Sequence, residues 1–341
     1  MSQRYGGEDD ARVRIRPNRH GSRPRTKDRP LHADAVTGFV VGVDRGRYRV
    51  LVDDGSSTQQ VTAMRARELG RKGIVVGDRV GLVGDTSGAP GSLARIVRIH
   101  ERSTVLRRTA DDTDPVERVI VANADQLVIV SALANPEPRP RLIDRALVAA
   151  YDAGLDPLLV LTKSDLRSPE DFLGQYAPLD VPSVVTSSAA FDEGGLDLLL
   201  GHLRGRVSVL LGHSGVGKST LVNALVPDAA RATGEVNDIT GRGRHTSTSA
   251  VALPLPDDDG WVIDTPGVRS FGLAHIDVDR IITNFPDLEA GTEECPRGCT
   301  HDEDECALDG WVAGGHAGPA GASRLESLRR LLRTRNAAAE D

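Results

Sequence analysis

The first patterned part of the chain consists of short runs rich in β-branched residues, separated by turn residues. Asp53-Asp54-Gly55 and Gly84–Gly91 read as turns, and no strong helical period interrupts the series. Five short strands over about 70 residues predict a small closed barrel, with the OB type as first choice. The expected strands are Gly38–Val43, Arg47–Val52, Gln59–Met64, Asp78–Val83 and Ala94–His100.

After Val119 the period changes, and apolar runs alternate with helical stretches such as Arg141–Ala153 and Lys218–Leu225. Continuous apolar runs are typical of parallel strands buried on both faces, so an α/β domain with a mainly parallel sheet is expected. Its strand candidates are Gln126–Ser131, Pro157–Leu161, Ser183–Thr186, Val207–Leu211 and Trp261–Ile263.

Beyond Leu273 the pattern predicts a small helical domain. It holds a helical stretch to about Asn284, all three cysteines, a Gly-rich run from Gly310 to Gly321, and a last amphipathic helix through Leu325, Leu328, Leu331 and Leu332. The expected organisation is therefore an arm at residues 1–34, a barrel at 35–108, an α/β domain at 115–273 and a C-terminal domain at 274–341.

Composition supports a folded, soluble chain, because 341 residues suffice for several cores and no apolar run approaches the roughly 18 residues of a spanning helix. A cytoplasmic location is the default expectation. The net charge of −7 argues at first against a nucleic-acid partner. It hides basic segments, however: Arg242 and Arg244, a C-terminal cluster, and an arm containing Arg12, Arg14, Arg16, Arg19, Arg23, Arg25, Lys27 and Arg29. This arm is expected to be disordered, as a solubilising tail or as a phosphate-backbone contact.

The strongest chemical signal follows the strand Val207–Leu211 and precedes a helix, as a GxxxxGK[ST] phosphate-binding loop requires. Glycines allow backbone amides to point at phosphate oxygens, and the helix N-terminus adds its positive end. Lys218 is expected to reach the β- and γ-phosphates, and the Ser219 hydroxyl to ligate Mg²⁺. The nucleotide-contacting set comprises Gly212, His213, Ser214, Gly215, Val216, Gly217, Lys218, Ser219 and Thr220.

The base preference is indicated by Thr162-Lys163-Ser164-Asp165, which fits [NT]KxD and follows an apolar strand. Asp165 can accept two hydrogen bonds from guanine that adenine does not offer, which disfavours an ATPase. Lys163 is expected to lie along the base plane, while Ser187, Ser188 and Ala189 match a loop that supports the guanine O6.

A second acidic motif, Asp264-Thr265-Pro266-Gly267, ends another apolar strand. Asp264 has the position of a carboxylate that holds Mg²⁺ through water, and the Gly267 amide can sense the γ-phosphate. The polar stretch from Gly241 to Thr248 has nothing to pack with and is expected to behave as a switch that an anion or partner orders.

The cysteines lie in a Cys-x3-Cys-x-His-x4-Cys pattern. Three thiolates and one imidazole supply four ligands with no open position, as a closed tetrahedral Zn²⁺ site requires. Three unrelated buried cysteines are the alternative. The expected ligands are Cys295, Cys299, His301 and Cys306.

The guanine motifs precede the phosphate-binding loop, the reverse of the usual GTPase order, which indicates a circular permutation. With the cysteine cluster, this order resembles the bacterial ribosome small-subunit-dependent GTPase A family over about residues 35–335. The resemblance implies a multidomain fold of an OB-type β-barrel, a permuted α/β P-loop GTPase domain and a small helical zinc domain. This chain departs from the family pattern at Thr162, which replaces Asn, at Ser247 in the switch, and in two cysteine gaps that are each one residue shorter.

The resemblance also implies site roles and an activity. Thr246 would complete the Mg²⁺ shell, and His245 would orient water, because Val268 stands where Ras-like enzymes carry glutamine. The expected protein is a cytoplasmic, monomeric GTP hydrolase using GTP/GDP, Mg²⁺ and one Zn²⁺. It would bind the 30S subunit and its 16S rRNA, with no membrane or DNA partner, and its turnover would be stimulated by the subunit in late assembly. A non-catalytic, GTP-dependent rRNA-binding scaffold is the alternative.

Overall fold

The computed structural model describes residues 32–53, 55, 57–70, 73–108, 118–187, 194–227, 250–265, 273, 276 and 278–337. The chain divides into two units, Met1–Ala33 and Asp34–Asp341, and only the second is described below. Outside the described residues lie most of the predicted basic arm, Ser188, Ala189, the stretch from Gly241 to Thr248 with His245 and Thr246, and the pair Gly267 and Val268.

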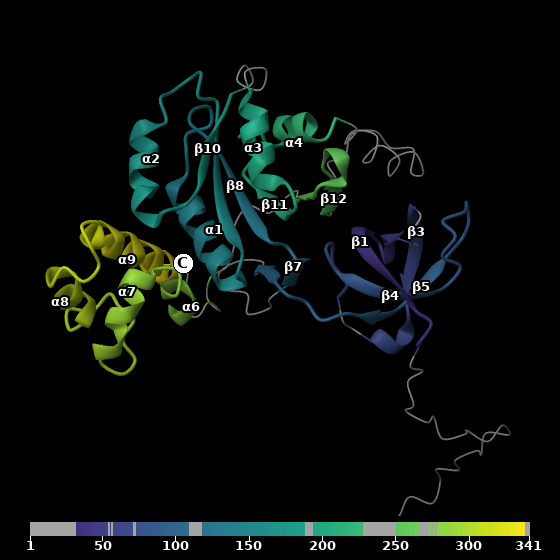
Figure 1. Ribbon diagram of the computed structural model, residues 1–341, viewed down its shortest axis with the longest axis horizontal. Coiled ribbons are helices and arrows are strands. Elements are labelled where there is room, and N and C mark those ends of the chain that lie inside the picture. The colour runs from purple at the N-terminus through teal and green to yellow at the C-terminus, as the bar shows by residue number, and fades with distance from the viewer. Residues whose placement is uncertain are drawn as a thin grey trace, which may run out of the picture. The chain divides into compact units, whose positions relative to one another are not determined.

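The N-terminal strands form a closed five-stranded barrel, drawn in purple and blue in Figure 1. The strand order is β1-β2-β3-β5-β4 and returns to β1, with β3 and β5 parallel. Alternate side chains face inward and bury a core that includes Val40, Val50, Val61, Leu82 and Ile96. The predicted barrel is confirmed. Its elements are β1 (Val36–Asp44), β2 (Arg47–Asp53), β3 (Thr58–Arg65), η1 (Arg67–Leu69), β4 (Arg79–Gly84) and β5 (Ala94–Ile99).

A hairpin that the pattern did not predict, β6 (Val105–Arg108) with β7 (Arg118–Ala122), leads out of the barrel. The Ala122 amide donates to the Val76 carbonyl at 3.0 Å, and the Asn123 side chain donates to the Gly77 carbonyl at 2.8 Å. A Cβ on Gly77 would lie 1.9 Å from the Ala122 oxygen, so this close approach requires glycine. The hairpin is therefore fastened to the barrel by a backbone hydrogen bond and by the Asn123 side chain.

The central sheet has the order β10-β9-β8-β11-β13-β12, parallel except for β12 (Figure 1). Its strands are β8 (Gln126–Ala132), β9 (Asp156–Thr162), β10 (Ser183–Val185), β11 (Val207–Leu211), β12 (Val251–Pro254) and β13 (Trp261–Asp264). Every residue of β8 is buried, which explains its uninterrupted apolar pattern. The edge strand β12 was not predicted, because four residues that end in proline give too short a signal.

Helices cover both faces of this sheet. Residues of α1 (Pro140–Ala153) pack into one buried cluster, and residues of α3 (Leu196–Leu203) and α4 (Lys218–Leu225) pack into a second. The short α2 (Glu170–Tyr176) and η2 (Ala177–Leu179) connect β9 to β10. At the far edge, Gly42 of β1 pairs with Val251 of β12, so the barrel strands continue the central sheet. The rings of Phe39 and Trp261 lie 5.2 Å apart at this junction.

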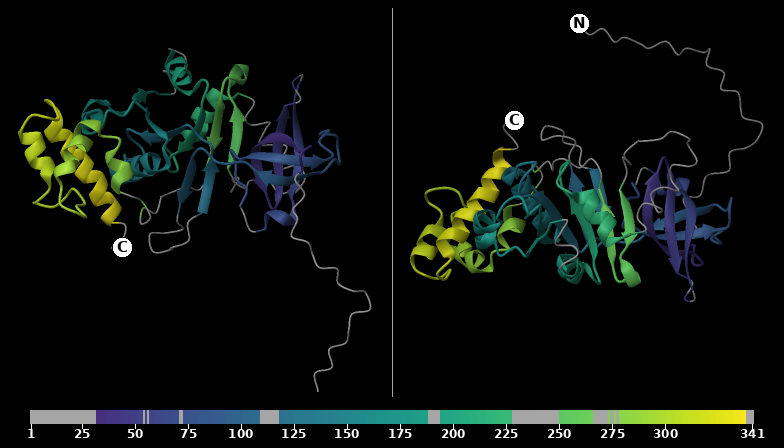
Figure 2. Two further views of the ribbon diagram at one scale, coloured as in Figure 1. Left: turned by 60° about the horizontal axis from the view of Figure 1, so that its bottom comes forward. Right: turned by 90° about the horizontal axis from the view of Figure 1, so that it is seen from above.

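The C-terminal part consists of short helices and one long one, shown in yellow-green and yellow in Figure 2. The long helix α9 packs against α1, and its Leu328 and Leu331 are fully buried. No helix within the described ranges is both long enough and apolar enough to span a bilayer. The elements are α6 (Val278–Ile282), α7 (Pro286–Glu289), η5 (Ala290–Glu294), α8 (Ala307–Ala313) and α9 (Gly321–Ala337).

Candidate functional site

The phosphate-binding loop connects β11 to the N-terminus of α4. Gly215 and Gly217 have φ values of 86° and 94°, which favour glycine, and a Cβ on Gly212 would lie 2.8 Å from the Val130 carbonyl oxygen. Val216 is fully buried and holds the loop onto the sheet, while Ser214 and Ser219 are exposed. The loop therefore has the backbone shape and open side that phosphate binding requires.

The guanine motif is joined to this loop by two side chains. The buried Thr162 hydroxyl donates to the Val216 carbonyl at 2.6 Å. The Lys163 ammonium donates to the Gly215 carbonyl at 2.8 Å and to the Asn135 carbonyl. Thr162 thus contributes by fixing the loop, a role that the sequence did not reveal.

Asp165 is exposed on the loop after β9, and no partner of its carboxylate is recorded among the described residues. It is therefore open to accept hydrogen bonds from a ligand. Ser187 follows the neighbouring strand β10 and is 7% exposed, and the Thr186 amide binds the Leu161 carbonyl at 2.8 Å. The two segments predicted to recognise the base consequently lie beside each other at the carboxyl ends of adjacent parallel strands.

Lys218 and Asp264 contact each other directly, from the first turn of α4 and the end of β13. Thr265, the next residue, donates through its hydroxyl to the Leu210 carbonyl at 2.8 Å and so ties the acidic motif to β11. The exposed Ser219 hydroxyl and the Asp264 carboxylate are hard oxygen ligands of the kind Mg²⁺ prefers. These residues fit a magnesium ion bound together with phosphate.

The described members of the predicted nucleotide set thus meet at one end of the central sheet. The switch residues His245 and Thr246, together with Ser188, Ala189 and Gly267, lie outside the described residues, so their roles stay predictions. Sequence reasoning missed the loop between β8 and α1, where Asn135 and Pro136 contact the guanine and phosphate motifs. The sequence signal that could have indicated this loop is its position directly after β8, which lies between the two strands that lead into the motifs.

The four predicted metal ligands gather in one cluster, with their ligand atoms all within 4.8 Å of one another. The Cys295 sulfur lies 3.9 Å from the Cys306 sulfur and 3.6 Å from the His301 Nδ1 atom. In a tetrahedral zinc site, bond lengths of about 2.3 Å to sulfur and about 2.0 Å to nitrogen place two sulfurs about 3.8 Å apart and sulfur and nitrogen about 3.6 Å apart. These two separations therefore match those of a tetrahedral zinc site, and the four ligand atoms lie close enough together to surround one ion.

The protonation chemistry of the cluster agrees with this fit. Burial raises the pKa of Cys299 to about 12 and also raises that of Cys306, so uncompensated thiolates are unfavourable here. Burial lowers the pKa of His301, which favours the neutral imidazole that binds metals. A divalent cation would supply the charge that stabilises the thiolates.

Side chains around the cluster hold its loops in place. The Arg329 guanidinium of α9 donates to the His301 carbonyl at 3.0 Å and to both oxygens of Asp309 at 2.9 and 2.6 Å. Hydrogen bonds from the Thr300 hydroxyl and amide lower the pKa of Glu303 to about 2. The ligand-bearing loop is therefore supported from α9 and by its own turn.

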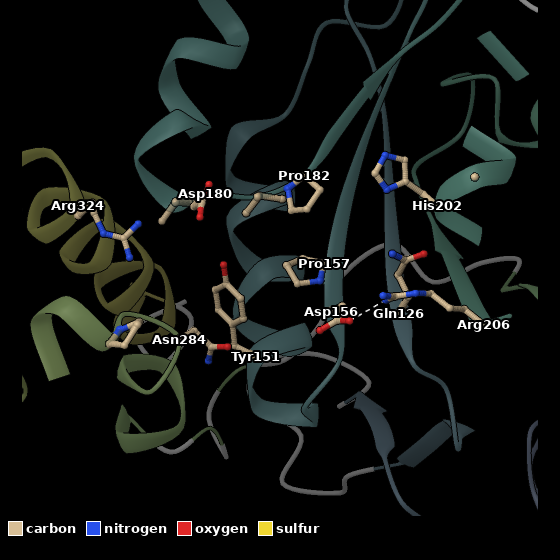
Figure 3. A pocket seen from close by; sticks show the side chains of 14 residues that line it. Gln126, Tyr151, Asp156, Pro157, Asp180, Pro182, His202, Arg206, Asn284 and Arg324 are labelled. Carbon is tan, nitrogen blue, oxygen red and sulfur yellow. Dashed lines mark hydrogen bonds and ion pairs between the residues drawn. The ribbon is translucent and has the colours of Figure 1, made fainter. Parts of the chain in front are cut away.

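A cavity of about 420 Å³ lies at the opposite, amino ends of the parallel strands (Figure 3). Gln126 and Asp156, the first residues of β8 and β9, line it together with Tyr151, His202 and Arg324. None of the predicted nucleotide residues that the structure describes lines this cavity. The candidate nucleotide site is thus the carboxyl edge, where α/β sheets usually bind ligands.

Comparison with known proteins agrees with this geometry. Residues 99–274 match the family described as RsgA GTPase. A protein of Gemmatimonas aurantiaca named small ribosomal subunit biogenesis GTPase RsgA is 35% identical over 302 residues, covering 87% of this chain and 96% of the relative. Relatives with the same name from Pseudomonas putida and Chlorobaculum parvum are 37% and 36% identical, over 86% and 88% of this chain and 84% and 98% of their own.

Solved structures show the same architecture. YjeQ from Thermotoga maritima aligns with a TM-score of 0.63 and 28% identity, over 88% of this chain and 98% of that one. YloQ, a circularly permuted GTPase, aligns with a TM-score of 0.62 and 22% identity, over 91% and 98%, which supports the fold. The permuted motif order agrees with the description of YloQ, and the chain belongs to the RsgA GTPase family.

Proposed function

We propose that this protein is a GTPase that acts in the biogenesis of the small ribosomal subunit. The observation that carries the proposal is the meeting of the phosphate-binding loop, Asp165 and Asp264 at one edge of the sheet, in a chain whose relatives bear that function in their names. Family membership supports GTP hydrolysis, with GTP as substrate and GDP and phosphate as products.

In this proposal, Asp165 selects guanine and the amides of Gly212–Ser219 bind the phosphates. Lys218 exchanges its contact with Asp264 for phosphate oxygens, because a polyanion offers it stronger charge-assisted hydrogen bonds. Ser219, Asp264 and Thr246 would hold Mg²⁺. When bound, that ion neutralises charge that develops on the phosphoryl oxygens.

His245 is our candidate for the residue that orients the attacking water, because Val268 has no polar group for that task. Its segment holds several polar residues and two arginines, which suits ordering by docking on RNA. We therefore propose weak intrinsic turnover that the small subunit accelerates. Late assembly is the proposed stage, with release after hydrolysis.

The barrel, the C-terminal domain of residues 274–341 that carries the proposed zinc ligands (the zinc module), and the basic arm are proposed to bind 16S rRNA through positively charged surfaces. Cys295, Cys299, His301 and Cys306 would hold one Zn²⁺ as a structural ion. We further propose that the protein works in the cytoplasm, because its partner, the small subunit, resides there. We also propose that it works as a monomer.

GTP turnover by wild type and by His245→Ala, each with and without isolated small subunits, tests this function. We expect subunits to raise wild-type turnover at least about tenfold, and the His245→Ala variant to lose about 10²-fold or more of that rate. Equal rates with and without subunits would refute the docking step. Negligible turnover in all four reactions, with GTP binding retained, would instead favour a GTP-dependent rRNA-binding scaffold.

A further inference from the structure

One strong side-chain pair beside the nucleotide site belongs to none of the motifs. Glu137 lies on the loop between β8 and α1, and Arg167 lies two residues beyond Asp165. The two terminal guanidinium nitrogens of Arg167, Nη1 and Nη2, donate to the two Glu137 carboxylate oxygens, each at 2.8 Å. This fork-to-fork geometry fixes direction as well as distance.

The loop that carries Glu137 is itself fixed to the phosphate-binding loop. The Asn135 carbonyl accepts a hydrogen bond from Lys163, which also donates to the Gly215 carbonyl. The Pro136 ring is the nearest group to Gly215, 3.5 Å from where its Cβ would lie. Glu137 is therefore held at a defined position relative to the phosphate-binding loop.

The loop that carries Asp165 has few other attachments. The Ser164 amide reaches the Thr186 carbonyl at 3.3 Å, and the Leu166 amide closes a local turn onto the Lys163 carbonyl at 3.0 Å. Beyond Asp165, the Arg167 side chain connects this loop to Glu137 on the loop between β8 and α1. The next side chain, Ser168, bonds locally to the neighbouring Glu170. On the amino side of Asp165, Thr162 and Lys163 are bonded to the phosphate-binding loop, and on its carboxyl side the Arg167 contact follows.

We propose that Glu137 and Arg167 form a positioning pair that sets the distance between the guanine-recognising carboxylate of Asp165 and the phosphate-binding loop. The inference rests on the proposed GTPase function and adds two residues that determine specificity for its substrate. Both side chains act through Asp165 and touch neither the reacting phosphate nor the base in this role. Their mutual hydrogen bonds lower the pKa of Glu137 and raise that of Arg167, so both stay charged at neutral pH.

The expected effect is modest because the pair is exposed, with Glu137 at 70% and Arg167 at 49%. Solvent screening limits such pairs to about two- to fivefold in an equilibrium constant. Glu137→Gln and Arg167→Gln should each raise KM for GTP and the dissociation rate of a fluorescent GDP analogue about two- to fivefold, with kcat at saturating GTP unchanged. The charge swap Glu137→Arg with Arg167→Glu should restore most of the loss.

The discriminating measurement uses ITP, whose base lacks the exocyclic amine and therefore makes one hydrogen bond fewer to Asp165. Misplacement of Asp165 should weaken the binding of GTP more than the binding of ITP. The preference for GTP over ITP should therefore fall in the Glu137→Gln variant. The matched control is Arg206→Gln, which breaks the similarly exposed Arg206–Asp156 pair at the opposite end of the sheet. That variant should leave the KM values for both nucleotides unchanged.

Three outcomes decide the matter. A wild type that binds GTP and discriminates against ITP, beside a Glu137→Gln variant with the same KM and the same preference, would overturn the positioning role alone. An equal loss of affinity for GTP and ITP in the Glu137→Gln variant would also overturn the positioning role, since the pair would then only stabilise the domain. A wild type that binds neither nucleotide would overturn the proposed function and with it this inference.

Discussion

The nucleotide edge and the zinc module secure their loops by different means. The phosphate-binding loop follows a strand whose Val209, Leu210 and Leu211 are almost fully buried, and protein hydrogen bonds hold it. Between Cys295 and Cys306, by contrast, only His301 and Cys306 are buried. The first site is shaped by a large apolar core before any ligand binds, whereas the second has a few charged contacts and would depend on the proposed metal ion.

The largest effect should come from removing a zinc ligand. Cys306→Ser should lower bound zinc from about one equivalent to below about half, because structural zinc contributes on the order of 10 kcal/mol to a segment without its own core. Limited proteolysis should then cut between residues 290 and 310. Metal analysis measures the state of the zinc module, and binding of a fluorescent GDP analogue measures the state of the nucleotide edge. Loss of nucleotide binding in parallel with zinc would show that the two sites are not independently secured.

A change at the nucleotide edge should alter specificity and leave the zinc module intact. Asp165→Asn should shift preference from GTP toward xanthosine triphosphate by roughly 10²–10³, because two charge-assisted hydrogen bonds are replaced. Competition binding measures the shift, and zinc content serves as the control. An unchanged preference would contradict the assignment of Asp165 to the base.

Thr162→Val tests whether protein hydrogen bonds hold the phosphate-binding loop. The valine keeps the shape but leaves the buried Val216 carbonyl without its 2.6 Å donor, which costs about 1–3 kcal/mol. We expect a lower free energy of unfolding in urea and weaker GTP binding, with zinc content unchanged. Wild-type stability and affinity in this variant would show that the contact is dispensable.

The smallest effect concerns the contact between α1 and α9, where Asp144 lies 3.3 Å from Arg330. Burial raises the pKa of Asp144, with Arg330 opposing the shift, so the folded state binds its proton more tightly than the unfolded state does. This group therefore adds stability as the pH falls from neutrality toward its ordinary value of 3.8, and loses that stability as the pH rises.

Asp144→Asn should remove this dependence and change the unfolding free energy at neutral pH by about 1 kcal/mol or less. Urea unfolding at several pH values measures it. If the difference in unfolding free energy between wild type and variant stays constant from about pH 4 to about pH 7, the raised pKa of Asp144 is contradicted.

Local sequence patterns were sufficient for much of the architecture. The five barrel strands and the parallel strands of the central sheet were placed within one or two residues, because burial on one or both faces leaves a direct period in the sequence. Elements with weak periods were missed, including the four-residue β12 and the hairpin of β6 and β7. The strands β6 and β7 pair with each other, and β12 pairs with β13 and with the distant β1, but runs of four or five residues are too short to leave a clear period in the sequence.

The sequence by itself determined the candidate site residues of this protein, namely the phosphate-binding loop, Asp165, Asp264 and the Cys3His set, since each belongs to a motif with fixed local spacing. Only the tertiary structure decided how these pieces meet. It brought Thr162 to Val216, 54 positions away, and Glu137 to Arg167, 30 positions away, and it joined β12 to the barrel. Such contacts depend on how buried strands and helices pack, and packing is a property of the whole fold.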